Sequence, residues 1–292
     1  MPRGSGHPLA GSQGSLPAAQ PMECSRSSRS QLRLFVWLAF GASWGIGGVA
    51  LLIDLWLADA RALTTSSPLY YLAAYSISGV GVLLTGYFFG ADGLRGLGRR
   101  LVPRPSDAWA YLAVMVTYAA ITGIAISTAH GIASVARLPW LGFGAHLPLA
   151  LVRDPGPLGE EFGWRGFALP RLVDSTSPLG ASLRLGLVHT LWHLPLFLVP
   201  GMPQAQVSFP AFAVGVMAIA AIDTVLYLRT ASSLSLAILV HLLANACGDL
   251  AQANGALTAF LLFEGLVALA LIALGTLTAL PVIRQLGRSY DP

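Results

Sequence analysis

Long apolar blocks recur along almost the whole chain, and this pattern constrains the fold more than any other feature. A helix that crosses the hydrocarbon core of a bilayer needs about 20 mostly apolar residues. By that measure the sequence predicts an all-α, polytopic membrane helix bundle of about eight transmembrane helices, with one shorter helix near 158–173. The predicted spans run at about 33–57, 68–90, 108–130, 138–152, 180–200, 207–229, 233–251 and 256–282.

The scarcity of charge agrees with this interpretation. Charged residues make up 10% of the 292 positions, whereas a soluble domain carries about 25%. All 17 basic residues are arginines, and no basic stripe with interleaved aromatic residues is present. A nucleic-acid partner is therefore not expected, and the lipid bilayer is the expected environment.

The arginines also predict a topology, because they gather in every second loop. By the positive-inside rule, this pattern predicts an even number of spans with both the N- and the C-terminus in the cytoplasm. The lysine-free, arginine-rich composition is typical of a GC-rich bacterial genome, so a bacterial plasma membrane is expected. The arginines on the cytoplasmic side are Arg26, Arg29, Arg33, Arg95, Arg99, Arg100, Arg104, Arg171, Arg184, Arg229, Arg284 and Arg288.

Three regions are expected along the chain. Residues 1–31 are polar and rich in Gly, Ser and Pro, which predicts a disordered N-terminal tail. Residues 32–284 form the predicted membrane domain, and 285–292 a short C-terminal tail. The two cysteines, Cys24 and Cys247, lie far apart and indicate neither a disulfide framework nor a CxxC metal site.

The first polar motif in this apolar chain is "GEEFGWR". On a helix, Glu161 and Arg165 stand at i and i+4 and can pair, whereas Glu160 points about 100° away. One glutamate is thus neutralised and the other is free to act as a general base. The alternative is a charge cluster at a helix end in the membrane interface.

The second motif is "HTLWHLP". His189 and His193 are one helical turn apart in an apolar span, where ionisable groups are functional candidates. The spacing matches the histidines of a zinc-binding HExxH helix, but Thr190 replaces its glutamate, and Glu160 could supply that carboxylate from another helix. Pro195 is expected to bend the helix just after His193. The alternative is a pair of histidines that only bond between helices.

The third motif is "HLLAN", in which His241 and Asn245 share one face of a span. The alternative for this pair is hydrogen bonding between helices. Asp223 and Glu264, which belong to no motif, are expected to be interhelical or interfacial polar groups. If the three motifs converge, they combine a carboxylate, imidazoles and an amide without a serine or cysteine nucleophile, which suits hydrolysis of an amide bond by an activated water.

The three motifs together resemble the CPBP family of intramembrane proteases, also called the Abi or CAAX-protease and bacteriocin-processing family. Its pattern is EExxxR, then FxxxH, then HxxxN or HxxxD, and the resemblance covers about residues 158–250. Glu160, Glu161 and Arg165 match the first element, His193 the histidine of the second, and His241 with Asn245 the third.

The sequence departs from this pattern at His189, which stands at the phenylalanine position of FxxxH. The change adds a polar group one turn from His193. His189 is therefore a candidate supporting residue of the pocket.

The resemblance implies a role for each matched residue. Glu160 and His193 would activate water, His241 and Asn245 would form the oxyanion site, and Glu161 with Arg165 would be the supporting pair. Zinc is left open as a cofactor. Its candidate ligands are Glu160, His193 and His241, while a water activated without metal is equally compatible with these residues.

The resemblance implies the activity of an intramembrane endopeptidase, from a family commonly described as metalloproteases, acting on a peptide or a membrane-associated protein. Prenylated-protein CAAX cleavage and bacteriocin processing or immunity are the tasks that the resemblance suggests. One alternative is a catalytically silent membrane scaffold or bacteriocin self-immunity protein with the same fold. A second alternative is a transporter with a proton relay, which would predict inverted repeats that the sequence does not contain. The substrate and the oligomeric state are left open.

Overall fold

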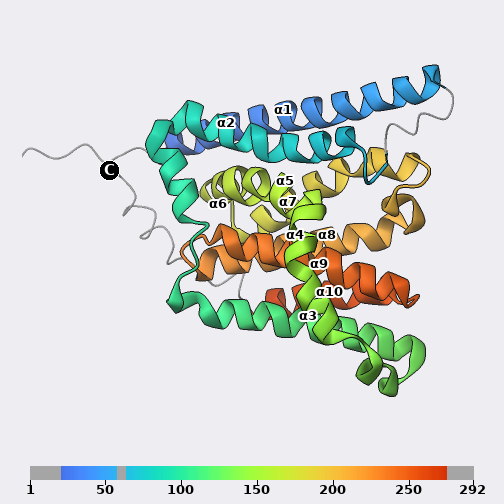
Figure 1. Ribbon diagram of the computed structural model, residues 1–292. Helices are drawn as coiled ribbons and strands as arrows, with labels where there is room; N and C mark the ends of the chain where they lie inside the picture. The colour runs from blue at the N-terminus through green and yellow to red at the C-terminus, as the bar shows by residue number, and fades with distance from the viewer. Residues whose placement is uncertain (1–20, 58–63, 275–292) are drawn as a thin grey trace, which may run out of the picture.

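The computed structural model describes residues 21–57 and 64–274, and the secondary structure of these residues is helical throughout. Figure 1 shows α1 and α2 side by side along one edge of the bundle, α3 at the opposite edge, and the later helices between them. The α-helices are α1 (Pro21–Trp56), α2 (Pro68–Arg99), α3 (Ala108–His130), α4 (Trp140–Arg153), α5 (Pro155–Glu161), α6 (Leu169–Ser175), α7 (Pro178–Trp192), α8 (Phe209–Arg229), α9 (Leu234–Ala253) and α10 (Leu257–Ala273). The shorter elements are the π-helical segment η3 (Phe162–Ala168) and the 3₁₀ turns η1 (Pro105–Asp107), η2 (Ile132–Arg137), η4 (Leu194–Leu198) and η5 (Pro203–Gln206).

The helical membrane bundle expected from the sequence is confirmed. Five of the described helical stretches are long and apolar enough to cross a bilayer: 27–54, 68–99, 105–130, 209–229 and 234–253. Helix α10 is a shorter apolar helix, and α4 and α7, with 14 and 15 residues, fall short of the ~20 residues that a lone crossing needs. The count of eight spans therefore stays a prediction.

Several predicted boundaries moved. Helix α1 begins at Pro21, before the predicted start of the membrane domain at residue 32. Helix α2 continues to Arg99 past Gly90, whose φ of 60° interrupts the helical backbone where the predicted span ended. Helix α4 runs through Pro148, since a proline inside a membrane helix is tolerated when neighbouring groups satisfy the freed carbonyl. Residues 1–20 of the predicted N-terminal tail and the whole C-terminal tail, 285–292, lie outside the described residues.

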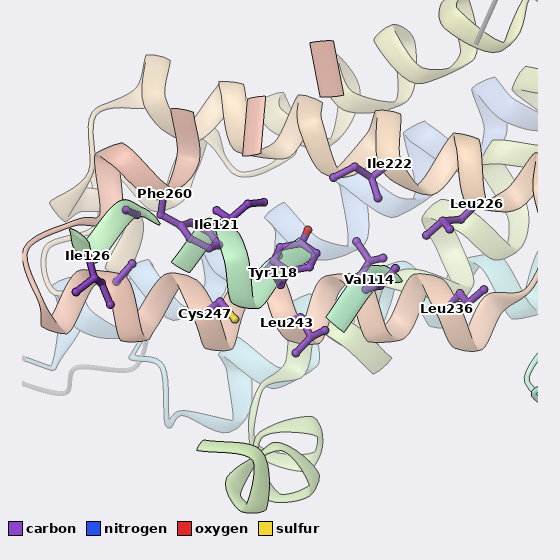
Figure 2. Close-up of a cluster of buried hydrophobic side chains, with 14 of the residues drawn as sticks. Val114, Tyr118, Ile121, Ile126, Ile222, Leu226, Leu236, Leu243, Cys247 and Phe260 are labelled. Carbon is purple, nitrogen blue, oxygen red and sulfur yellow. The ribbon is translucent and has the colours of Figure 1, made fainter. Parts of the chain in front are cut away.

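One apolar core joins the third helix to the last three. Figure 2 shows Tyr118 and Val114 of α3 facing Leu243 of α9, with Ile222 of α8 and Phe260 of α10 closing the cluster. Cys247 of α9 is a buried free cysteine in the same core. This core fixes α8 and α9, the two helices that carry Asp223, His241 and Asn245 to the centre of the bundle.

A second contact holds the segment with the two glutamates against α2. A Cβ on Gly163 would lie 2.5 Å from the carbonyl oxygen of Ile77, and one on Gly81 would lie 2.7 Å from Cα of Gly163. Only glycine permits this approach, which is the means by which membrane helices commonly pack backbone to backbone. The hydroxyl of Ser78 then donates to the carbonyl of Leu158 at 2.9 Å and accepts from the amide of Phe162 at 3.2 Å.

Candidate active site

The predicted short helix is a continuous helical run from α5 through η3 to α6, and it carries both glutamates. Asp154, in an extended conformation, separates it from α4. The guanidinium of Arg100 donates to two carbonyls of η3, those of Arg165 and Gly166, at 2.8 and 3.0 Å. It also donates to the carbonyl of Ser232. Arg100 thus ties the end of α2 to the segment that presents the two glutamates.

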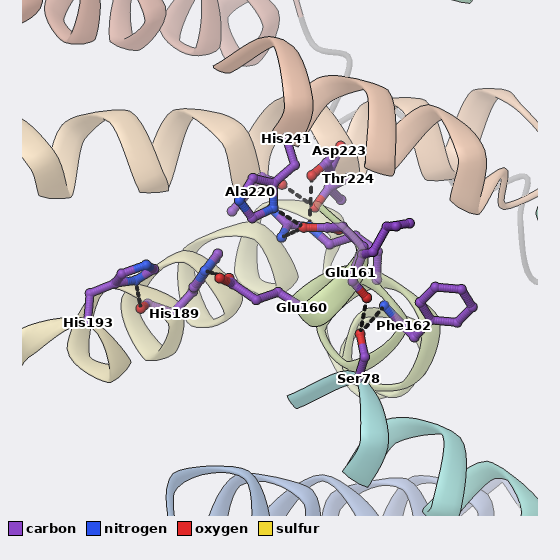
Figure 3. A network of polar contacts seen from close by, with 12 residues as sticks. Ser78, Glu160, Glu161, Phe162, His189, His193, Ala220, Asp223, Thr224 and His241 are labelled. Atoms are coloured by element: carbon purple, nitrogen blue, oxygen red, sulfur yellow. Dashed lines mark hydrogen bonds and ion pairs between the residues drawn. The ribbon is translucent and has the colours of Figure 1, made fainter. Parts of the chain in front are cut away.

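Glu161 lies in a fully buried ionic cluster. Arg165 donates to its Oε1 from Nη1 at 2.8 Å, as the i,i+4 spacing predicted. The same Oε1 lies 2.7 Å from Nδ1 of His241, and Nε of Arg165 forms an ion pair at 2.7 Å with Oδ2 of Asp223 on α8 (Figure 3). Two ionised carboxylates and one guanidinium would leave one negative charge, which an imidazolium at His241 would balance.

Glu160 turns to the other side of the helix and meets α7. Its Oε2 lies 2.9 Å from Nε2 of His189, and both side chains are buried (Figure 3). The ring of His189 packs beside those of Trp164 and His193, with centroids 5.0 Å away in each case. His189 departs from the family pattern and was a candidate supporting residue of the pocket. The structure places it beside Glu160.

The tautomer of His193 follows from its backbone contact. Nδ1 of His193 lies 3.0 Å from the carbonyl oxygen of His189, and a carbonyl can only accept, so Nδ1 carries the proton. In the neutral ring, Nε2 then offers a lone pair. Helix α7 ends at Trp192, and a 3₁₀ turn starts at Leu194 with Pro195 in its first turn, which is the break predicted just after His193.

His241 and Asn245 lie one turn apart on α9, as predicted, and face the first turn of α5. Nδ2 of Asn245 donates to Oδ2 of Asp154 at 2.7 Å. Since Nδ1 of His241 contacts the Glu161 carboxylate and donates to it, Nε2 is the ring nitrogen left for another partner. In the imidazolium form this nitrogen is a second donor.

A cavity of about 790 Å³ joins these groups. Its lining includes all four residues that the sequence put forward as catalytic, whereas Glu161 and Arg165 are not among the lining residues. A single helical step thus separates Glu160, which lines the cavity, from Glu161, which does not. The four residues are Glu160, His193, His241 and Asn245, and His189 also lines the cavity.

The candidate metal ligands differ from those expected. Among the described residues, Glu160, His189 and His193 offer ligand atoms that all lie within 4.8 Å of one another. His189 belongs to this group instead of the expected His241. Two imidazoles and a carboxylate with one position open suit zinc, so these residues fit the metal.

Asp223 and Glu264 are interhelical polar groups, as expected. Asp223 pairs with Arg165, and Glu264 on α10 accepts a hydrogen bond of 2.6 Å from the hydroxyl of Tyr118 on α3. The specific pairing of Asp223 was not readable from the sequence, because it joins residues far apart in the chain. Asp154 was missed, and its only signal was a carboxylate just before the Pro155 that starts the glutamate helix.

Comparison with known proteins points to the same region. Residues 147–247 match the model of the Rce1-like family, described as type II CAAX prenyl endopeptidase Rce1-like. A curated relative, CAAX prenyl protease 2 of Methanococcus maripaludis, is 33% identical over 92 residues, which is 30% of this chain. The matched part spans about a third, 34%, of that relative's length. The segment that carries all three motifs is therefore similar to proteases of the CPBP/CAAX type.

Proposed function

We propose that this protein is an intramembrane endopeptidase that hydrolyses a peptide bond of a membrane-associated protein or peptide. The observation that carries the proposal is the pair of acceptors at one end of the cavity, the Glu160 carboxylate and Nε2 of His193. A water between them would donate one hydrogen to each and turn its lone pair toward a bound carbonyl. The family match over 147–247 and the name of the relative support the same reaction class.

The proposed reaction uses four side chains. Glu160 takes a proton from the water as the oxygen attacks the peptide carbonyl, and Nε2–H of His241 with Nδ2–H of Asn245 donate to the oxyanion that forms. The protonated Glu160 then gives its proton to the leaving amine as the C–N bond breaks. His189 holds the carboxylate of Glu160 in place through the 2.9 Å contact.

Glu160, His189 and His193 could also hold a metal ion. The proposal therefore includes a metal-assisted form of this site. A bound zinc would supply Lewis-acid polarisation of the substrate carbonyl and a more acidic water. In that form Glu160, His189 and His193 would hold the ion. Nε2–H of His241 with Nδ2–H of Asn245 would still donate to the oxyanion.

The test is hydrolysis of membrane-anchored peptides, among them a prenylated CAAX peptide, by the purified protein in liposomes. Glu160→Gln should lower the rate by about 10²–10⁴-fold, the range for a general base. Asp92→Asn, the same change at an exposed residue that pairs only with Arg95 in the structure, should leave the rate unchanged. Equal rates for wild type and Glu160→Gln would overturn the proposal. A folded wild type that cleaves no probe would favour the silent scaffold or immunity protein.

A chelator separates the two forms of the site in the same assay. Activity that is lost with chelator and restored by zinc would establish the metalloprotease form. Activity that is retained with chelator would establish water activation by Glu160 and His193 alone.

We further propose that the protein lies in a bacterial plasma membrane with both termini in the cytoplasm. The support is the cluster of arginines between α2 and α3 and Arg229 at the end of α8, which the positive-inside rule assigns to the cytoplasmic side. A reporter that is active only in the cytoplasm, fused to the C-terminus, should be active. An inactive fusion of a protein that is correctly inserted would contradict this orientation.

A further inference from the structure

Asp154 joins the start of the glutamate helix to the predicted oxyanion helix. It lies between α4 and α5 with an extended backbone, and its Oδ1 accepts from the amide of Gly156 at 2.9 Å, so it caps the first turn of α5. Its Oδ2 accepts from Nδ2 of Asn245 on α9 at 2.7 Å. One carboxylate oxygen therefore accepts a hydrogen bond within its own turn, and the other accepts one from a helix that is distant in the sequence.

The second contact selects the orientation of the Asn245 amide. A carboxamide presents an acceptor on one side and two N–H donors on the other, and its two orientations have nearly the same shape. An ionised carboxylate only accepts, so the amino side of Asn245 must face Asp154. One N–H is then used by Asp154, and the second remains for another acceptor in the cavity that Asn245 lines.

Gly156 brings the backbone of the same turn against both donor nitrogens. A Cβ at Gly156 would lie 2.6 Å from Nε2 of His241 and 3.1 Å from Nδ2 of Asn245. The turn 154–156 thus contacts the two groups that the proposed function assigns to the oxyanion. The same α5 presents Glu160 at its other end, which sets the distance between the base and the oxyanion donors.

We propose that Asp154 is a positioning residue, which orients the Asn245 carboxamide so that an N–H rather than the carbonyl oxygen faces the substrate. The catalytic part of this inference rests on the proposed function. The orientation of the amide does not, and it can be measured without any substrate.

The orientation of the Asn245 amide can be measured by NMR because the chain has only two asparagines, Asn245 and Asn254. Protein labelled with ¹⁵N-asparagine should give two side-chain NH₂ signals, and Asn245→Ala assigns them by removing one. Asp154→Ser keeps a side chain that caps helices but has no second oxygen to reach Asn245. In this variant the Asn245 amide should exchange with solvent about fivefold faster, as expected for the loss of roughly 1 kcal/mol of hydrogen bonding, while the Asn254 signal stays unchanged. An Asn245 amide with unchanged shift and exchange rate would overturn the proposal.

A double-mutant cycle then separates positioning from simple capping of α5. Asp154→Ser should lower kcat about tenfold with little change in KM, which is less than the ~10²–10³-fold that loss of an oxyanion donor costs. In the Asn245→Ala background the same substitution should lower kcat no further, because Asp154 acts through Asn245. An equal drop in both backgrounds would mean that Asp154 acts through Glu160 and α5 instead, and would contradict the proposal.

The two proposals fail in different ways. If no probe is hydrolysed, or if Glu160→Gln is as active as wild type, the proposed function fails while the amide signals still decide the orientation of Asn245. If hydrolysis depends on Glu160 and the Asn245 amide is unchanged by Asp154→Ser, only the role of Asp154 fails.

Discussion

Glu160 and Glu161 are neighbours in the chain, yet their side chains lie in two different chemical environments. Glu161 contacts Arg165 and His241, and Arg165 is paired in turn with Asp223, so this carboxylate belongs to a cluster of opposite charges inside the bundle. Glu160 contacts His189 and lines the cavity. The 100° between successive helical residues is enough to direct one carboxylate into the ionic cluster and the other toward the cavity.

The difference shows how one polar segment can serve both stability and chemistry. A buried charge with all its partners present holds three helices together, and removal of any member leaves another uncompensated. A buried carboxylate with a free acceptor in a cavity contributes less to folding and is available for reaction. Substitutions on the Glu161 side should therefore change stability, and substitutions on the Glu160 side should change the rate of hydrolysis.

The largest effect on folding is expected for Arg165→Met. The substitution leaves the carboxylates of Glu161 and Asp223 buried without their shared cation, which costs about 3–5 kcal/mol for a broken buried ion pair. The free energy of unfolding in mixed micelles measures it. Arg184→Met, on an exposed arginine of α7, should change that free energy by less than about 0.5 kcal/mol. Equal stability of the two variants would contradict the balanced cluster.

On the Glu160 side, His193→Ala should affect catalysis and leave folding almost unchanged. Loss of the acceptor that holds the water should lower kcat by roughly 10²-fold, the lower end of the range for acid–base groups. The rate of peptide hydrolysis and the unfolding free energy should be measured on the same preparation, with His130→Ala at an exposed histidine as the control. A variant with a lower unfolding free energy but a normal rate of hydrolysis when folded would mean that His193 serves stability and not catalysis.

The smallest effect is expected for Tyr118→Phe, which tests the buried carboxylate of Glu264. Glu264 lines the cavity, and within the described residues it forms no hydrogen bond or ion pair with Glu160 or Glu161. Glu264 would lose the hydroxyl that donates to its Oε1, at a cost of about 1–2 kcal/mol for an unsatisfied buried acceptor. The unfolding free energy should fall by that amount, whereas hydrolysis by the folded protein should persist. Tyr87→Phe, at an exposed tyrosine of α2, is the matched control. A loss of hydrolysis without a loss of stability would mean that Glu264 takes part in the reaction.

The sequence predicted the parts of this site that depend on helical period. The pairing of Glu161 with Arg165 and the shared face of His241 and Asn245 both follow from the i,i+4 spacing, and the hydropathy pattern predicted the helical membrane bundle. The proline at 195 also predicted where α7 ends. These features are local, so the order of residues is sufficient to infer them.

Contacts between helices could not be inferred in the same way. No local pattern marks Asp223 as the second partner of Arg165, and none favours His189 over His241 beside Glu160. Which nitrogen of His241 faces Glu161 depends on the packing of α9 against α5, and this packing also brings Asp154 to Asn245. Helix ends were uncertain as well, as the extension of α2 past Gly90 illustrates.

The most direct test of the account compares Glu160→Gln with Glu161→Gln, because the two variants make the same chemical change at adjacent positions. For each, hydrolysis of a membrane-anchored peptide and the free energy of unfolding should be measured on one liposome or micelle preparation. The account predicts that Glu160→Gln loses hydrolysis by about 10²–10⁴-fold with wild-type stability. It predicts that Glu161→Gln loses about 3 kcal/mol or more of stability, because Arg165 and His241 lose their shared carboxylate. An active, unstable Glu160→Gln beside an inactive, stable Glu161→Gln would contradict it.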